Sequence, residues 1–181
     1  MIHQFLGDFS AFMLYCGMVA VIHVCSGFQW GLRTMTALNN FDRLLRQELV
    51  HRVVDPLLRR CRTLLEFNRV MRNGRFSGQH ERGMQMIAVD QIIGTVGRGA
   101  DFDRQFRPRR RNMEHRWMKI QEMFEHDQPL PAVEVYKVDD AYFVSDGHHR
   151  VSVARANGAA YIDAHVIEID VDEPLPACDT P

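Results

Sequence analysis

Hydrophobic residues recur at spacings of three and four, with arginines between them, once the chain reaches Leu38. This period continues to Leu49 and is typical of an amphipathic helix. Asp55-Pro56 then interrupts the pattern. Because Asp is a favourable N-cap and Pro suits the first helical position, the sequence predicts a second helix from Pro56 to about Arg72, ended by Gly74.

The middle of the chain is less regular. Arg75 to Gly83 has the polar, turn-forming composition of a linker, and Met86 to Val89 reads as a short strand followed by a glycine-rich loop. After a run of arginines, Asn112 is a suitable cap for a helix that ends near Asp127.

The last third gives the clearest pattern. Ala132 to Val138 and Ala141 to Ser145 flank Asp139-Asp140, which predicts a β-hairpin with a two-residue turn. A short helix over Val151 to Asn157 and a closing strand over Tyr161 to Ile169 follow. The order of elements predicts a compact α+β domain preceded by a helical region.

The chain divides into four expected parts: a hydrophobic N-terminal segment over residues 1–34, a helical arm over 35–75, the α+β domain over 84–170 and an extended acidic tail over 171–181. Residues 9–32 contain no Asp, Glu, Lys or Arg, and as a helix they would be long enough to cross a bilayer. Three interpretations stay open: a membrane helix, an over-extended start of the reading frame, and a helix packed on the domain. The expected location is the cytoplasm, or a membrane anchor with the C-terminal domain on the cytoplasmic side.

The net charge of −1 hides an asymmetry. Residues 1–119 carry 19 Lys and Arg against 10 Asp and Glu, and residues 120–181 carry 3 against 13. The basic half can attract nucleic acid or phosphorylated ligands, or the two halves can attract each other. The four cysteines form no CxxC pair, which favours reduced thiols.

The segment Ser-Asp-Gly-His-His-Arg, which starts at Ser145, carries the candidate chemistry. A strand that passes through a glycine into a helix gathers backbone N–H groups at the positive end of the helix dipole, where phosphate binds well. Gly147 allows close approach of a ligand, and Arg150 can grip phosphate oxygens. His148 and His149 can move protons near neutral pH, and Asp146 can bind magnesium.

Two alternatives stay open for this segment. In the first, Asp146 caps a helix, Gly147 makes the turn and both histidines are ordinary surface residues. In the second, Asp146, His148 and His149 form a metal site, although the spacing matches no HxxxH or HExxH pattern.

Leu130 to Ile169, with its strand, Gly-x-x-Arg turn, helix and closing strand, resembles the core of the ParB/sulfiredoxin superfamily. Met86 to Arg98 is similar to the strand and loop that open that domain, so the resemblance covers about half the chain. It implies a turn that binds nucleotide phosphates, with Mg²⁺, through Gly147, His149, Arg150 and Arg98. Members of the superfamily bind CTP, ATP or ADP there.

Departures from individual families narrow this expectation. His148 stands where sulfiredoxin has its reactive cysteine, which excludes that activity. Partition ParB has a helix-turn-helix domain downstream, whereas 12 residues follow Ile169 here, so we do not expect a complete partition factor. The local pattern is most similar to that of the free-serine kinases, whose threonine is replaced by His149.

The resemblance also places the arginine cluster beside the phosphate turn, where it would clamp a triphosphate or a nucleic-acid backbone. The cluster consists of Arg107, Arg109, Arg110 and Arg111. The alternative for it is a solvated run of charge.

Three functions follow. The leading one is a nucleotide-phosphate-binding domain that is nucleic-acid-associated or nucleotide-gated. The second is a small-molecule kinase or nuclease that uses Asp146, His148 or His149 with magnesium. The third is a DNA- or partner-binding module without catalysis. A homodimer, and contact of residues 9–32 with a membrane, also stay open.

Overall fold

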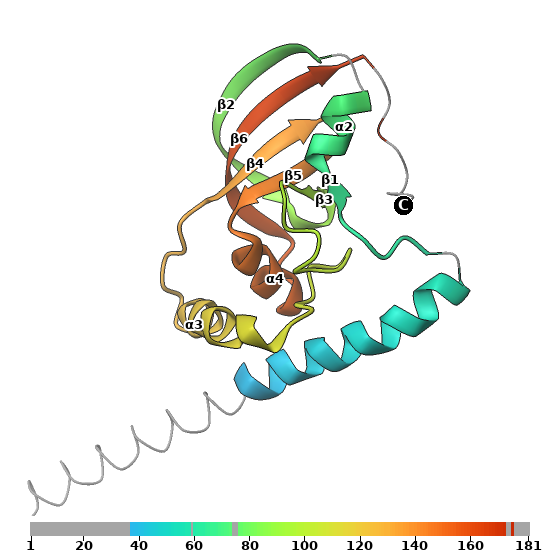
Figure 1. Cartoon of the computed structure of the whole chain (residues 1–181). Helices are drawn as coiled ribbons and strands as arrows, with labels where there is room; N and C mark the ends of the chain where they lie inside the picture. Colours follow the sequence, from blue (N-terminus) through green and yellow to red (C-terminus); the bar gives the residue numbers. More distant parts are fainter. Residues whose placement is uncertain (1–36, 59, 74–75, 173–174, 176–181) are drawn as a thin grey trace, which may run out of the picture.

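The computed structural model describes residues 37–58, 60–73, 76–172 and 175 of the chain (Figure 1). A mixed sheet of six strands in the order β1-β3-β5-β4-β6-β2 forms its centre. The strands are β1 Leu65–Glu66, β2 Phe76–Ala88, β3 Ile92–Thr95, β4 Val133–Val138, β5 Ala141–Asp146 and β6 Tyr161–Val171. This architecture confirms the predicted α+β class with a helical region before the sheet domain.

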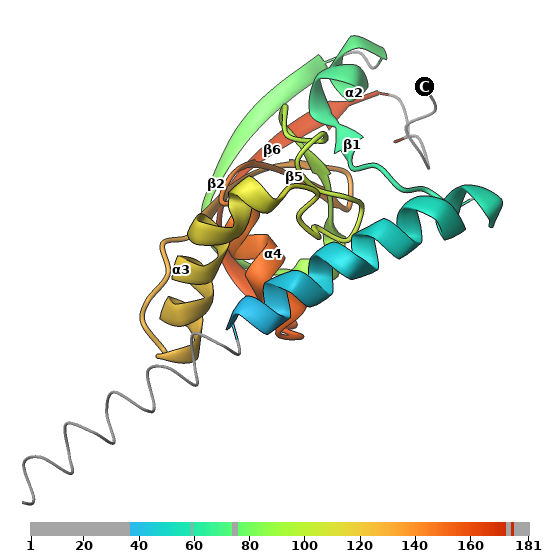
Figure 2. The same ribbon diagram turned by 60° about the horizontal axis from the view of Figure 1, so that its bottom comes forward.

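Helices cover both faces of the sheet. The N-terminal helix, described over residues 37–57, lies with α3 and α4 on one face, and α2 lies on the other (Figures 1 and 2). The bounds of the labelled helices are α2 Phe67–Asn73, α3 Glu114–Glu125 and α4 His148–Ala156, with short 3-10 turns η1 Val89–Gln91 and η2 Arg111–Met113.

Two hydrophobic clusters hold these layers together. On the first face, Phe41 and Trp117 pack with sheet residues such as Val135. On the second, Leu65 and Val70 of the α2 side pack with their own set of sheet residues. The alternation of buried residues along β4 and β6 supplies both clusters, because successive side chains of a strand point to opposite faces.

Strands β1, β3 and β5 are parallel neighbours. Their carboxyl ends therefore meet at one edge of the sheet, where Glu66, Thr95 and Asp146 are the last strand residues. Segments that follow parallel strands at such an edge are the usual place for ligand sites in sheets of this kind. The edge brings together three segments that are up to 80 residues apart in sequence.

The predicted hairpin is confirmed. β4 and β5 pair antiparallel around the Asp139-Asp140 turn, and Asp139 adopts a φ of 51°. The closing strand is confirmed as well, and it continues to Val171. Gly158, with a φ of 69°, follows the last turn of α4 as expected.

The predicted second helix is right only in its last part, which forms α2 Phe67–Asn73, and it is wrong between Pro56 and Glu66. The N-terminal helix runs through Asp55 and Pro56 to residue 57, and residues 60–64 form neither a helix nor a strand before the chain enters β1. Because Pro56 is the penultimate helical residue, it removes one backbone N–H near the helix end and does not break the helix interior. The carboxylate of Asp55 lies 3.0 Å from Nδ1 of His51 one turn back, so it does not cap a new helix.

The predicted linker is also wrong. Residues from Phe76 to Gly83 form the first part of β2, which pairs along its length with β6. The pairing is irregular at two places, near Ser77 and Arg82. Each lies next to one of the glycines, Gly78 and Gly83, that suggested a loop. The sequence pattern also missed β3, whose four residues are too short to show a period, and it placed the start of α3 close to its real position at Glu114.

Among the described residues, no helix is both long enough and apolar enough to cross a bilayer. The hydrophobic segment 9–32 lies outside the described residues. Cys61 is disulfide-bonded, so the expectation of reduced thiols is wrong for this residue.

Candidate functional site

The turn that opens α4 requires a glycine. Gly147 is the N-cap residue, with a φ of 98° in the left-handed region. A Cβ at this position would lie 2.6 Å from Cγ1 of Val133. Because Gly147 itself is the N-cap residue of α4, the proposed capping role of Asp146 is wrong. Backbone N–H groups of the first helical turn, which includes His148 and His149, therefore lie at the carboxyl edge of the parallel strands.

His148, the first residue of α4, is buried beneath this edge with an exposed fraction of 3%. Its Nε2 lies 2.7 Å from the hydroxyl oxygen of Thr95, and its ring stacks on Phe102. Burial, assisted by the charge of Arg98, lowers the pKa of His148 to about 4. His148 is therefore neutral at pH 7 and joins β3 to α4, whereas the surface position considered from sequence is wrong.

His149 is buried to a similar degree, with an exposed fraction of 6%. Its ring meets Phe102 edge-on, and its Nδ1 is buried without a hydrogen-bond partner among the described residues. Burial first, and then the charges of Arg116 and Arg98, lower the pKa of His149 to about 4. A buried polar nitrogen without a partner lowers the stability of the fold. A ligand atom that forms a hydrogen bond with it would remove this cost.

Arg150 does not point to open space. It donates hydrogen bonds to the carbonyl oxygens of Pro131 and Ala132, and it forms an ion pair with the carboxylate of Asp146. Asp146 is 59% exposed, whereas the side chain of Arg150 is 12% exposed. In this arrangement Arg150 connects the segment before β4 to α4. To bind phosphate as predicted, Arg150 would have to give up these hydrogen bonds.

The backbone N–H groups of the loop after β3 donate to one carboxylate, that of Glu66, and to one hydroxyl, that of Thr95. The backbone N–H groups of Gly97 and Gly99 donate to the carboxylate of Glu66, at 3.1 and 3.0 Å. The N–H of Arg98 donates to the Thr95 hydroxyl, and the guanidinium of Arg98 pairs with Asp101. The loop is thus shaped to surround an anion, and an internal carboxylate occupies it.

The arginine cluster separates into two kinds of residue. Arg107 and Arg109 have side chains only 11% exposed, and they pair with Asp103 and Glu48. These two arginines fix the loop and the N-terminal helix in place. Arg110 and Arg111 are 59% and 70% exposed, and only they remain open to an outside partner such as nucleic acid.

The described residues contain no group of three His, Cys, Asp or Glu side chains that could hold a metal ion. The alternative metal site of Asp146, His148 and His149 is therefore not formed. Asp146 fits magnesium only as a single exposed carboxylate, with phosphate oxygens and water as the remaining ligands, which is the usual manner in which Mg²⁺ binds with nucleotides.

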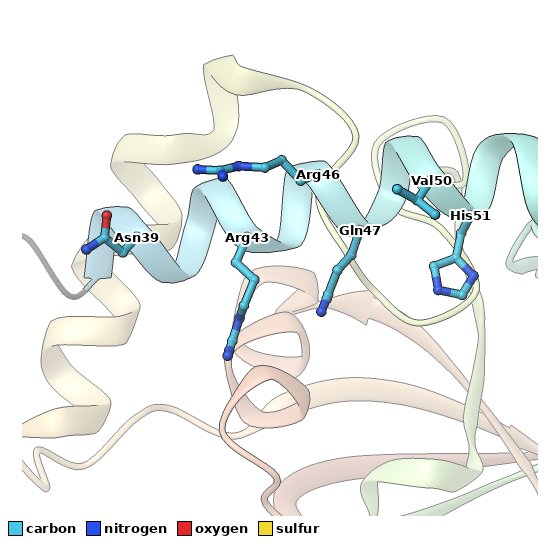
Figure 3. Close-up of a pocket in the computed structure, with 6 residues that line it drawn as sticks. All are labelled: Asn39, Arg43, Arg46, Gln47, Val50 and His51. Atoms are coloured by element: carbon cyan, nitrogen blue, oxygen red, sulfur yellow. The ribbon is translucent and has the colours of Figure 1, made fainter.

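A pocket lies along the N-terminal helix (Figure 3). Its volume is about 430 Å³, and it is lined by Asn39, Arg43, Arg46, Gln47, Val50 and His51. Because all six side chains come from one helix, no second element fixes a ligand there. This surface adds positive charge and no defined binding geometry.

Sequence reasoning missed several residues around the turn. Thr95, Glu66 and Phe102 lie far from the Gly-x-x-Arg segment in sequence and belong to no recognisable motif. Arg116 lies on the exposed side of α3 and is distant from His149 in sequence. The fold brings its charge close enough to lower the pKa of His149. Thr95 could have been found as the polar residue that ends a strand, but the sequence pattern did not reveal that strand, β3.

Comparison with family models, with curated proteins and with solved structures gave no match in any of the three.

Proposed function

We propose that the chain is a nucleotide-phosphate-binding domain of the ParB/sulfiredoxin type, and that it binds a phosphate group where α4 begins. The observation that carries the proposal is the buried Nδ1 of His149 in the first turn of α4, which has no hydrogen-bond partner in the part of the chain that the structure describes. A phosphate oxygen placed there would satisfy this nitrogen and lie near the positive end of the helix.

The surrounding charges support an anion. Arg98 and Arg116 are close enough to His149 to lower its pKa, and Arg116 is exposed and takes part in none of the ion pairs found among the described residues. Asp101 acts in the opposite direction, but its carboxylate is already paired with Arg98. The carboxylate of Asp146, at the turn itself, is likewise paired, with Arg150, so Arg116 is the exposed cation that can meet an added anion.

Isothermal titration calorimetry with ATP, ADP, CTP and GTP, each with and without Mg²⁺, tests the proposal. We expect at least one nucleotide to bind, and we expect Arg116→Gln and His149→Ala each to weaken binding by about tenfold or more, since a hydrogen bond to a charged group contributes roughly 1.5–3 kcal/mol. Arg111→Gln is the matched control, because Arg111 is exposed and paired with Asp42 and Glu114. If no nucleotide binds, or if all three variants bind equally, the proposal is wrong.

Phosphoryl transfer or hydrolysis at the same turn is the second candidate. A pKa of about 4 makes His148 and His149 weak bases at neutral pH, and Asp146 is engaged by Arg150. We therefore expect nucleotide binding without rapid turnover. Mg²⁺-dependent release of phosphate that is abolished by Asp146→Asn would favour the enzymatic function instead.

DNA binding rests on a different observation, the exposure of Arg110 and Arg111. A DNA-associated function predicts that affinity falls steeply with salt and weakens when both arginines become glutamine. Arg107 and Arg109 are unsuitable for this test, because their substitution would disturb buried ion pairs.

A further inference from the structure

The sheet has a long free edge at β2. Among the described strands it lies last in the order, and β6 is the one strand that pairs with it. Figures 1 and 2 both show β2 as the outermost strand, with no described helix or strand alongside its outer edge. At 13 residues it is longer than most strands. An exposed edge of this kind is a template for pairing with another chain.

Only part of this edge is protected by charge. In the first part of β2, His80, Glu81 and Arg82 form ion pairs with side chains of β6. From Gly83 to Ala88 the sequence Gly-Met-Gln-Met-Ile-Ala contains no charged residue. The irregular pairing at Arg82 separates the two parts. Proteins usually protect edge strands with charges or bulges, so the uncharged part is the exception that needs an explanation.

This part of β2 and the adjoining start of β6 carry the exposed large apolar side chains of the described sheet. Met84, Met86 and Tyr161 are exposed by 63%, 70% and 59%. Met86 and Tyr161 also line a groove of about 370 Å³, whose remaining walls are partly apolar and partly polar: Phe124, Leu130, Pro131 and Ile162, with Asp127, Gln128 and Asp163. An apolar patch beside an unprotected strand edge is typical of an interface.

We propose that this edge pairs with the same edge of a second copy of the chain, antiparallel and about a two-fold axis at Gln85. This register places Met84 opposite Met86 of the partner subunit, and Gly83 opposite the partner's Ile87. Arg82 meets the partner's Ala88. The two six-stranded sheets then form one continuous sheet. The proposal does not depend on nucleotide binding.

Self-complementarity favours a second copy over a different protein. Met84 and Met86 share one face of β2 and are equally distant from Gln85, so a two-fold axis there brings all four methionines together. No like charges face each other across the pairing, because the segment is neutral from Gly83 to Ala88. Interfaces in which the same patch is used twice are the commonest form of homo-oligomer.

Light scattering coupled to size-exclusion chromatography of the full chain tests the association. We expect a mass of twice the 21.0 kDa chain, and we expect Met84→Lys/Met86→Lys to reduce it to 21.0 kDa at the same concentration. Val53→Lys is the matched control, since Val53 is 64% exposed and lies on the N-terminal helix. A wild-type mass of 21.0 kDa at every concentration overturns the proposal, as does a dimer that survives the methionine substitutions.

Cysteine cross-linking tests the register. A two-fold axis at Gln85 places the two copies of this residue directly opposite each other, about 4.5–5.5 Å apart between Cα atoms, within the range that a disulfide spans. We expect Gln85→Cys to form a disulfide-linked dimer through the introduced cysteine, identified by peptide mapping. Gln79→Cys is the control: two copies of Gln79 would lie roughly 40 Å apart. Equal cross-linking of both variants, or none at Gln85, rejects this register.

Discussion

Thr95 and His148 join the end of β3 to the start of α4 through a buried hydrogen bond of 2.7 Å. Thr95 also accepts a hydrogen bond from the N–H of Arg98, so its hydroxyl fixes the following loop as well. We expect Thr95→Val to lower the free energy of unfolding by about 1–3 kcal/mol, because it leaves a buried nitrogen of His148 without a partner. Urea unfolding measures the change. Thr95→Ser keeps the hydroxyl, so a loss as large as that of the valine variant would contradict this explanation.

The two histidines predict a dependence of stability on pH. Both pKa values are lowered from 6.5 to about 4 in the folded state. The unfolded chain therefore binds protons first as the pH falls. Their stabilising contribution is complete above pH 6.5 and is lost between about pH 6.5 and 4, by up to about 3 kcal/mol for each histidine. Urea unfolding across this pH range should show the loss.

His148→Gln is the variant that separates this effect from the titration of carboxylates. Glutamine can still bond to Thr95, but it does not take up a proton in this range. We expect the variant to have a shallower pH dependence than the wild type between pH 6.5 and 4. Parallel curves for the two proteins would show that His148 is not responsible.

Anion binding should reverse the shift at His149. A phosphate bound at Nδ1 favours the protonated ring, so the pKa of His149 is expected to rise from about 4 towards neutrality when a bound nucleotide saturates the site. Nuclear magnetic resonance of the ring nuclei measures this directly. His148 is the internal control, because its Nε2 is already bonded to Thr95. A nucleotide that binds without moving the titration of His149 would place the phosphate elsewhere.

Gly147 provides a test of the backbone geometry of the turn. We expect Gly147→Ala to destabilise the fold by about 2–4 kcal/mol, since it combines a φ of 98° with a Cβ only 2.6 Å from Val133. Gly158→Ala is the matched control, because Gly158 also has a positive φ but no atom within 4 Å of the added Cβ. We expect it to cost about 1 kcal/mol. Thermal or urea unfolding that finds equal losses would show that the contact with Val133 is unimportant.

The sequence correctly predicted the elements whose type and position depend on residues close by in the chain. The hairpin around Asp139, the helix that ends before Gly158 and the closing strand depend on local turn chemistry and alternation, and all three were found. Two of the errors have one cause. Whether Pro56 begins a helix or ends one, and whether Phe76 to Gly83 is a linker or a strand, is decided by distant partners that local patterns do not contain.

The candidate site shows the same limit. The Gly-x-x-Arg segment located the start of α4, but its neighbours Thr95 and Glu66 come from strands that only the sheet brings together. The burial of His148 and His149 could not be read from a polar segment, because it results from the loop around Phe102 that covers them. The arginine cluster looked uniform in sequence, and only the fold distinguishes its buried members from its exposed ones.

The ion pair of Arg109 and Glu48 allows the difference between buried and exposed members of the arginine cluster to be measured. Glu48 lies in the N-terminal helix with an exposed fraction of 1%, and it accepts hydrogen bonds from both Arg109 and Arg52. Replacing Arg109 with Met removes one of its two cationic partners, so we expect the free energy of unfolding to fall by about 3 kcal/mol, near the lower end of the range for buried ion pairs. Urea unfolding gives the value.

The exposed pair of Arg111 and Asp42 is the matched comparison, because it also connects the arginine cluster to the N-terminal helix. We expect Arg111→Met to change stability by less than about 1 kcal/mol, as is usual for surface ion pairs. If Arg109 holds the helix against the loop, the double variant Arg109→Met/Glu48→Met should recover part of the loss, since it leaves no buried charge unpaired. Purely additive losses would show that Arg109 acts through other contacts, such as its bond to the carbonyl oxygen of Gly99.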